Sequence, residues 1–186
     1  MQRPTVMPIA DHLSTLPPLT LVLGGARSGK SRYAESLFAG RLEPIYLATA
    51  QAGDAEMTAR IRHHQQRRGD RWQTVEEPLD LVLALEMHAR PGRAILVDCL
   101  TLWLTNVLLA DLDVEAECER LASHLVGLNA PVVFVSNEVG LGIVPDNALT
   151  RAFRDHAGWL NQKVAARCQR VVFVAAGLPL LLKDIR

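Results

Sequence analysis

Residues 24–31 read Gly-Gly-Ala-Arg-Ser-Gly-Lys-Ser and directly follow the apolar run 19–23. This is the pattern G-x-x-x-x-G-K-[ST], placed between a predicted strand and a predicted helix. Glycines let such a turn close tightly, so that its backbone N–H groups point inward at phosphate oxygens. A Gly-rich turn that binds nothing is the alternative. We expect the turn to bind a nucleoside triphosphate through Gly24, Gly25, Ala26, Arg27, Ser28, Gly29, Lys30 and Ser31.

Within this turn two side chains have distinct expected tasks. Lys30 is predicted to reach the β- and γ-phosphates, and the Ser31 hydroxyl is predicted to hold Mg²⁺. A second magnesium group is expected from the run 94–98, Ala-Ile-Leu-Val-Asp, which is apolar and ends in an acid as a Walker-B strand does. Asp98 would assist Mg²⁺ directly or through water. The alternative is that Asp98 caps the helix that follows near Thr101.

The segment 54–68 is dense in basic residues, including Arg60, Arg67 and two adjacent histidines. A solvated helix face would explain this composition, but beside a triphosphate site these residues suit phosphate contacts. On a helix His64 joins the apolar stripe of Ile61, which favours a structural role. His63 points roughly 100° away, toward the basic side. Its imidazole could attack phosphorus and hold a nucleotidyl group as a phosphoramidate.

A further loop of interest follows the run 132–136. Asn137 and Glu138 are followed by two glycines, Gly140 and Gly142. Glycines at the ligand edge of a sheet suggest a backbone that approaches another group closely. A bare turn is an equally good interpretation of these residues.

Composition narrows the class of partner. The 186 residues suit one domain, and 20 basic and 20 acidic residues give no net charge. We therefore expect a small-molecule substrate rather than nucleic acid. No apolar run is long enough for a membrane span. Three cysteines, far apart, lack metal-ligand spacing and are interpreted as small residues in a reducing cytoplasm.

Short apolar runs alternate with helical stretches along the chain. Strands are expected at 19–24, 44–48, 94–98, 132–136 and 171–175. Helices are expected at about 30–39, 54–68, 78–89, 101–110, 113–128 and 147–167. Continuously apolar strands are typical of a parallel sheet covered on both faces. We predict an α/β fold, a three-layer P-loop NTPase (RecA-like) domain with a mainly parallel sheet over 19–186, and an N-terminal extension or poorly ordered arm over 1–18.

Missing motifs remove two classes of nucleotide-binding protein. The chain has no Asn-Lys-x-Asp motif, which a Ras-type GTPase would use to read guanine, and no Leu-Ser-Gly-Gly-Gln signature of transporter ATPases. Three hypotheses stay open from the residues alone. The chain could transfer both phosphoryl and nucleotidyl groups, act as a small-molecule kinase through the phosphate turn alone, or bind a nucleotide as a non-catalytic regulator.

The chain resembles the bifunctional adenosylcobinamide kinase/adenosylcobinamide-phosphate guanylyltransferase family of cobalamin biosynthesis. The phosphate turn is shared by many enzymes, whereas the paired histidines and the Asn-Glu-Val-Gly segment are specific. The resemblance extends from Leu19 onward. It is carried by 24–31, Tyr46-Leu47-Ala48-Thr49-Ala50, Glu56-Met57, Ala59-Arg60-Ile61, His63-His64, Trp72, Thr74, Glu76, Asp98-Cys99-Leu100-Thr101, Asn106, 136–145, Arg151, Phe153-Arg154-Asp155, Gly158 and Asn161-Gln162.

This resemblance implies two reactions. A nucleoside triphosphate, ATP or GTP, phosphorylates adenosylcobinamide, and GTP then guanylylates a histidine whose GMP passes to adenosylcobinamide phosphate. The first histidine of the pair carries the GMP, which corresponds to His63. The family forms trimers, so a homo-oligomer is expected. Further GTP contacts are implied at Thr49, Ala50, Gln51, His64, Gln65, Gln66, Arg67, Glu76 and Asp98.

Overall fold

A computed structural model describes residues 16–40, 44–51 and 71–185. Seven strands form one sheet in the order β3-β2-β4-β5-β1-β6-β7. All neighbours pair in parallel except β6 and the edge strand β7, which are antiparallel. The strands are β1 (Leu19–Gly24), β2 (Ile45–Ala48), β3 (Gln73–Glu76), β4 (Ile95–Asp98), β5 (Val132–Asn137), β6 (Arg170–Ala175) and β7 (Leu178–Asp184).

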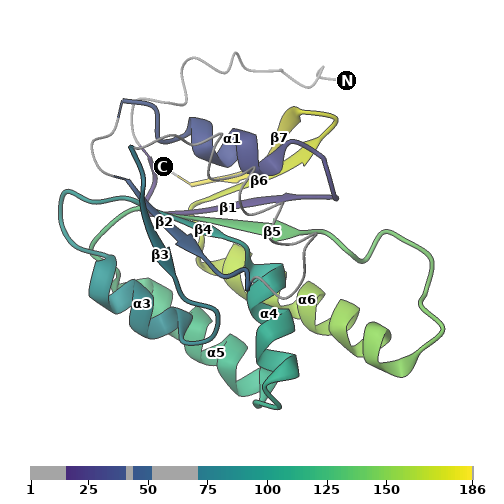
Figure 1. The fold of residues 1–186 in the computed structure, drawn as a ribbon. Helices are drawn as coiled ribbons and strands as arrows, with labels where there is room; N and C mark the ends of the chain where they lie inside the picture. The colour runs from purple at the N-terminus through teal and green to yellow at the C-terminus, as the bar shows by residue number, and fades with distance from the viewer. Residues whose placement is uncertain (1–15, 41–43, 52–70, 186) are drawn as a thin grey trace.

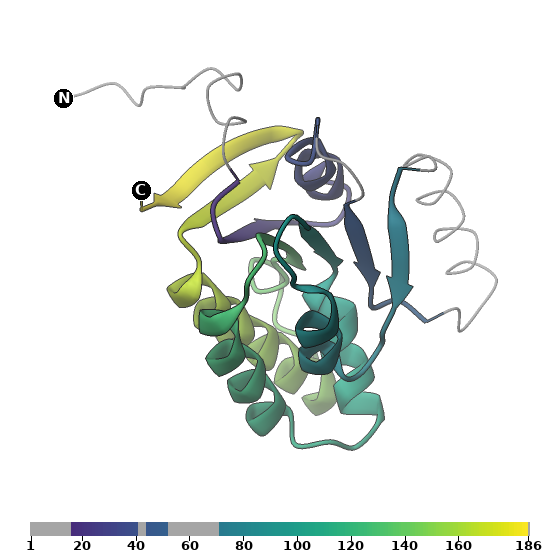
Figure 2. The same ribbon diagram turned by 90° about the vertical axis from the view of Figure 1, so that its left-hand side faces the viewer.

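Helices cover both faces of this sheet (Figures 1 and 2). The short helix α1 (Lys30–Ser36) lies on one face. The other face carries α3 (Leu81–His88), α4 (Leu100–Leu109), α5 (Val114–His124) and α6 (Ala148–Arg167), with a 3₁₀ turn at Leu125–Gly127 after α5. Figure 2 shows β3 at the edge of the sheet opposite the β6–β7 hairpin. The described part of the chain therefore has the predicted three layers.

Successive side chains of the central strands enter two separate cores, because neighbouring residues of a strand point to opposite faces. Leu21 and Leu23 join the larger core beneath α3, α4, α5 and α6. Val22 joins the smaller core beneath α1, together with Tyr46 and Trp72. Leu21 and Val22 are both fully buried. Burial on both faces explains why these strands read as continuous apolar runs.

The predicted P-loop α/β class is confirmed, and each of the five predicted strands forms within one residue of its expected ends. Two strands were not predicted, β3 and the antiparallel β7. Helix α3 begins later than expected, at Leu81, because the Asp80 side chain accepts a hydrogen bond from Leu83 N and caps the helix. The expected helix 54–68 and most of the expected extension 1–18 lie outside the described residues.

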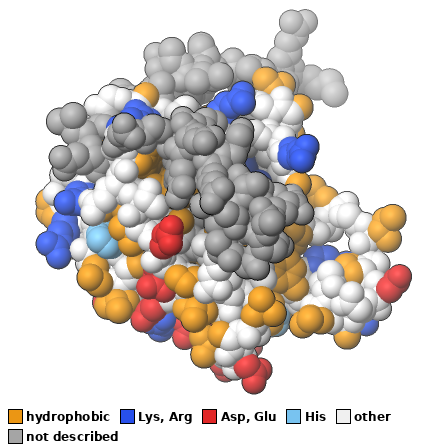
Figure 3. Space-filling view, in the orientation of Figure 1, with side chains coloured by type: hydrophobic (Ala, Val, Ile, Leu, Met, Phe, Trp, Pro, Cys, Tyr) orange, Lys and Arg blue, Asp and Glu red, His pale blue; other side chains and the backbone are white. Residues whose placement is uncertain are grey.

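The outer surface mixes apolar and charged side chains (Figure 3). Exposed apolar residues occur on the loop between β5 and α6, at Leu141, Ile143 and Val144, and along β7, at Leu178, Leu180 and Leu182. Across the described residues, no helix combines the length and apolar character that crossing a membrane requires. Cys99, Cys118 and Cys168 are free and buried, as expected for small core residues.

Gly24, the last residue of β1, faces the backbone of β6. A Cβ at this position would lie 2.5 Å from Val174 O and 2.6 Å from Ser28 Oγ. The sheet can therefore close around the end of β1 only if this residue has no side chain. For the next residue, Gly25, no atom of the described residues other than its chain neighbours lies within 4 Å of the position of a Cβ.

Gly24→Ala should therefore destabilise the protein, and Gly25→Ala is its matched control. We expect a loss of about 1–3 kcal/mol for Gly24→Ala, because overpacking forces the backbone of β6 aside. Gly25→Ala should leave the free energy of unfolding unchanged within about 0.5 kcal/mol. Urea denaturation of the nucleotide-free protein measures both. Equal stability of the two variants would contradict the close contact between Gly24 and β6.

Candidate nucleotide site

The predicted phosphate-binding turn, 24–31, is held by backbone hydrogen bonds from two neighbouring loops. Glu138 N donates to Gly24 O at 3.1 Å, and Gly177 N donates to Ser28 O at 2.8 Å. Within the turn Ser28 N donates to Gly25 O at 3.3 Å. The turn is thus fixed on both sides, by the β5–α6 loop and by the β6–β7 turn. Its backbone has its shape before any ligand arrives.

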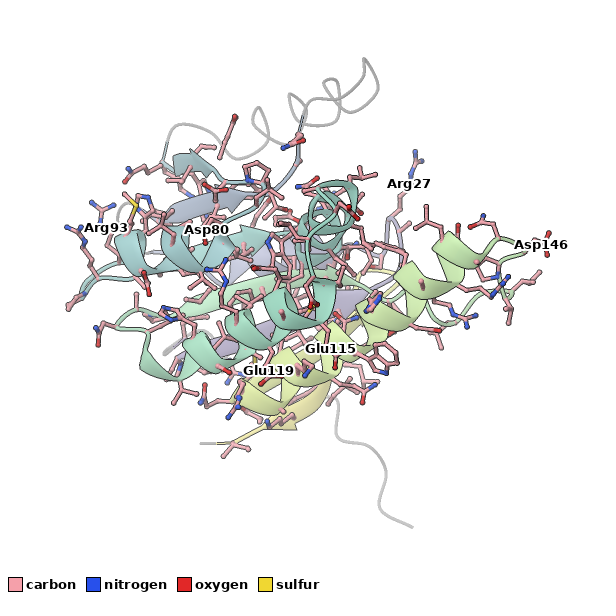
Figure 4. The ribbon with its side chains drawn as sticks, turned by 90° about the horizontal axis from the view of Figure 1, so that it is seen from below. Arg27, Asp80, Arg93, Glu115, Glu119 and Asp146 are labelled. Carbon is pink, nitrogen blue, oxygen red and sulfur yellow. The ribbon has the colours of Figure 1, made fainter. Side chains whose placement is uncertain are left out.

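The sequence of the turn matches this conformation. Gly29 adopts φ +95°, in the region that L side chains rarely adopt, and directly precedes α1. Arg27 also has a positive φ, of 56°. Its exposed side chain points away from the body of the protein (Figure 4). Ser28 is buried, and its hydroxyl lacks a partner among the described residues.

Lys30 brings a charge to the inside of the turn. Its Nζ donates to Gly25 O at 3.2 Å. Burial lowers the pKa of Lys30, while the neighbouring Cys99 and Asp98 act in the opposite direction. Helix α1, which begins at Lys30, contacts β4, which ends at Asp98, so the structure brings these two segments together. A cation with little competing solvent is suited to phosphate oxygens.

Asp98 ends β4 and is half-buried. Its Oδ2 accepts a hydrogen bond from the Tyr46 hydroxyl at 2.9 Å. The alternative prediction, that Asp98 caps the next helix, is not what the structure shows. The N-cap residue of α4 is Cys99, and no side chain caps that helix end. The carboxylate is thus available for the expected role beside Mg²⁺.

The donor set around the turn suits a magnesium ion. A hydroxyl on Ser31 and a carboxylate on Asp98 are hard oxygen donors, which Mg²⁺ prefers. Among the described residues, no group of three or more His, Cys, Asp or Glu side chains could hold a metal ion. In proteins Mg²⁺ is commonly bound by one or two carboxylates, and substrate phosphates and water complete its coordination.

The strands beyond β4 place other predicted contacts at the same edge of the sheet. Ala48 of β2 pairs with Asp98 on one side and with Glu76 of β3 on the other. Glu76 therefore lies level with Asp98 at the carboxyl edge of the sheet. Ala50 and Gln51 follow the end of β2 at the same edge. Both Glu76 and Gln51 are exposed and so are accessible to a ligand.

Thr49 has a different environment from the one that a nucleotide contact suggests. Its side chain is completely buried, and its hydroxyl donates to Cys99 O at 2.7 Å and accepts from Cys99 N at 2.9 Å. Asn106 Nδ2 donates to Thr49 O at 2.8 Å and to Pro78 O at 3.0 Å. Thr49 therefore joins β2 to the backbone after Asp98. A contact of Thr49 with GTP stays a prediction.

The end of β5 lies between β1 and β4, and so between the phosphate turn and Asp98. Asn137 N donates to the Thr101 hydroxyl at 2.8 Å, and Asn161 Nδ2 donates to Asn137 O at 3.2 Å. A Cβ on Gly140 would lie 2.9 Å from Glu138 Oε1, which accepts from Gly140 N. The close approach at this glycine is therefore made by its own loop. Gly142 has open space around it, as a bare turn would.

Two sets of residues separate the predicted site from the observed one: predicted residues that are not described, and observed residues that were not predicted. The predicted nucleophile His63 and the predicted contacts His64, Gln65, Gln66 and Arg67 lie outside the described residues. Tyr46 and Thr101 were not among the predicted site residues. No sequence signal identifies their hydrogen bonds, because these bonds depend on which strands become neighbours.

Comparisons with known proteins agree with this geometry. A family sequence profile described as "Cobinamide kinase / cobinamide phosphate guanyltransferase" matches residues 20–182. The bifunctional adenosylcobalamin biosynthesis protein CobP of Pseudomonas aeruginosa is 54% identical over 166 residues, which are 88% of this chain and 96% of that protein. The corresponding CobU of Escherichia coli K12 is 40% identical over 180 residues, 89% of this chain and 99% of that protein.

A solved structure extends the comparison to the fold. An ATPase from the type III secretion system of pathogenic bacteria matches with a TM-score of 0.53 at 12% identity, over 88% of this chain and 56% of that one. At this identity the match shows a shared fold alone. The sequence matches carry the assignment: this chain belongs to the cobinamide kinase / cobinamide phosphate guanyltransferase family.

Proposed function

We propose that this enzyme carries out both reactions of its family at the carboxyl edge of the sheet, with His63 as the nucleophile of the second. The observation that carries the proposal is the preformed turn 24–31, which leads into α1 where that helix packs against β4, the strand that Asp98 ends. In the first reaction the hydroxyl oxygen of the aminopropanol arm of adenosylcobinamide attacks the γ-phosphorus of a nucleoside triphosphate. The nucleoside diphosphate leaves, and the hydroxyl proton is released.

The second reaction has two steps. An imidazole nitrogen of His63 attacks the α-phosphorus of GTP, pyrophosphate leaves, and the GMP is held through a phosphorus–nitrogen bond. A phosphate oxygen of adenosylcobinamide phosphate then attacks the same phosphorus. The bond to His63 breaks, and the product is adenosylcobinamide-GDP. This assignment is supported by the sequence alone: helical spacing of the segment 54–68 predicts that His63 shares a side with Arg60 and Arg67.

In this proposal both reactions require Mg²⁺. Ser31 and Asp98 would hold it, and the ion would neutralise charge on the phosphates. The guanine nucleotide would be contacted by Thr49, Ala50, Gln51, His64, Gln65, Gln66, Arg67 and Glu76. The exposed ends of β2 and β3 beside Asp98 support the contacts from Gln51 and Glu76. We place these reactions in the cytoplasm.

Lys30 is held in a state that favours a phosphate ligand. Its lowered pKa means that burial in the free protein disfavours the ammonium form. An arriving triphosphate adds negative charge that stabilises the ammonium form. The same burial that makes Lys30 unfavourable for folding therefore makes it favourable for binding.

We also propose that the chain acts as a homo-oligomer, a trimer as the family resemblance implies. Apolar side chains exposed on the edge strand β7, at Leu178, Leu180 and Leu182, support association, because an open apolar edge is rarely left uncovered.

The nucleophile is tested by labelling. The protein incubated with Mg²⁺ and GTP labelled at the α-phosphate should retain acid-labile, alkali-stable label. His63→Ala should reduce this label by at least about a hundredfold, because it removes the attacking nitrogen. His124→Ala is the control, because His124 lies on α5 beside Glu86, and this variant should keep the label. Label that survives His63→Ala would show that another group carries the GMP.

The same variant, His63→Ala, should keep the first reaction and lose the second. His63→Ala should still transfer the γ-phosphate of ATP or GTP to adenosylcobinamide, because that step uses the phosphate turn and needs no histidine nucleophile. Product analysis should find adenosylcobinamide phosphate and no adenosylcobinamide-GDP. A protein that transfers γ-phosphate and never takes up α-label, even with His63 present, would instead be a kinase alone.

Lys30→Met should weaken nucleotide binding without lowering the stability of the free protein. The variant loses a charge-assisted contact, so the affinity for Mg²⁺–GTP should fall on the order of ten- to a hundredfold. Without nucleotide it should melt at the same temperature as the wild type or higher, because the cost of burying the ammonium group is removed. Calorimetric titration and thermal unfolding measure the two effects. A large drop in melting temperature would contradict this view of Lys30.

A further inference from the structure

We propose that Tyr46 is a positioning residue for the reaction, which orients the Asp98 carboxylate by the hydrogen bond from its hydroxyl to Oδ2. The bond is 2.9 Å long and joins β2 to β4, residues 52 positions apart in the chain. Within the described residues, this is the only side-chain hydrogen bond that the Asp98 carboxylate makes. One carboxylate oxygen is thereby engaged, and the other is left for a ligand.

The Tyr46 ring is itself held firmly in the smaller core. The residue is 5% exposed. Its ring meets Trp72 edge-on, with centroids 6.0 Å apart and planes at 89°, and Trp72 in turn packs on Phe38 with centroids 4.9 Å apart. Three aromatic rings, from β2, from the residue before β3 and from the segment after α1, thus fix the direction of the phenol. A donor held in this way can select one orientation of the carboxylate.

The backbone on the other side of Asp98 is fixed by the same strand. Thr49 holds both the N–H and the carbonyl of Cys99 through its hydroxyl. Tyr46 of β2 therefore acts on the side chain of Asp98, and Thr49, the residue after β2, acts on the backbone that follows Asp98. Without the Tyr46 hydroxyl, the half-exposed carboxylate could rotate away from the phosphate turn. Groups that orient metal-associated carboxylates in this way affect metal affinity about ten- to a hundredfold.

This inference rests on the proposed role of Asp98 beside Mg²⁺. The test measures how much Mg²⁺ is needed for half-maximal binding of a fluorescent GTP analogue to the full chain. Tyr46→Phe keeps the ring and removes only the hydroxyl. We expect it to raise the required Mg²⁺ concentration about tenfold, while the affinity for the analogue in EDTA stays that of the wild type. General damage to the fold would also lower the affinity in EDTA. An unchanged affinity in EDTA therefore shows that the substitution acts on the use of Mg²⁺ alone.

Tyr33→Phe is the matched control. Tyr33 is the other tyrosine of the chain, lies half-buried on α1 and packs against the same smaller core. Burial raises the pKa of its hydroxyl, and the charged groups near it are Arg170 and Asp184 rather than Asp98. This variant should show the wild-type Mg²⁺ requirement.

Asp98→Asn separates the failure of this inference from the failure of the proposed function. It should raise the Mg²⁺ requirement, and adding Tyr46→Phe to it should have no further effect, because Tyr46 acts through Asp98. If Asp98→Asn raises the requirement but Tyr46→Phe does not, Tyr46 does not position Asp98, while the proposed function stands. An equal effect of Tyr46→Phe with and without Asp98→Asn likewise overturns the inference. If Asp98→Asn has no effect, the magnesium role of Asp98 fails, and the positioning role fails with it.

Discussion

The close approach of three backbone segments around Gly24 and Ser28 is the constraint on which the rest of the site depends. Strand β1 is paired in parallel with β5 on one side and β6 on the other. The loops that follow these two strands therefore reach the same turn. Each donates one backbone N–H to it, from Glu138 and from Gly177. The topology of the sheet thus gives the turn its shape, and the shape of the turn sets the position of Lys30.

A second set of contacts holds the other half of the site. Strand β5 separates β1 from β4, so Asp98 cannot be positioned by the phosphate turn itself. It is positioned from the far side, by Tyr46 of β2 and by Thr49, the residue after β2, and Asn106 of α4 holds the carbonyl of Thr49. Lys30 and Asp98 come from independently supported segments, which meet where α1 packs against β4.

Sequence patterns predicted the parts of this fold in which local residues decide the structure. The five central strands are apolar because both of their faces are buried, so their apolar runs identify them. Strand β3 reads Gln-Thr-Val-Glu and is mostly exposed, so it has no such run. Strand β7 was missed for another reason: its leucines are exposed on an edge. The bond between Tyr46 and Asp98 depends on strand neighbours, which no local pattern encodes.

The assignment of His63 came from a different source, the helical spacing of its segment together with the family resemblance. The described residues add a topological argument. Strands β2 and β3 are parallel neighbours, so the chain leaves the sheet at its carboxyl edge, at Gln51, and returns at the opposite edge, at Arg71. The connection that contains His63 therefore begins beside Glu76 and Asp98 and ends where Trp72 packs against Tyr46.

This arrangement separates the two chemical tasks along the triphosphate. Attack on the γ-phosphorus requires a phosphate chain held still and an acceptor hydroxyl brought to its end. Attack on the α-phosphorus requires a nucleophile at the other end of the same chain. In the proposed function, Lys30 at the start of α1 and Asp98 at the end of β4 would serve both tasks. His63 comes from the connection between β2 and β3, so a second nucleophile would be offered to the α-phosphorus from a segment separate from the phosphate turn.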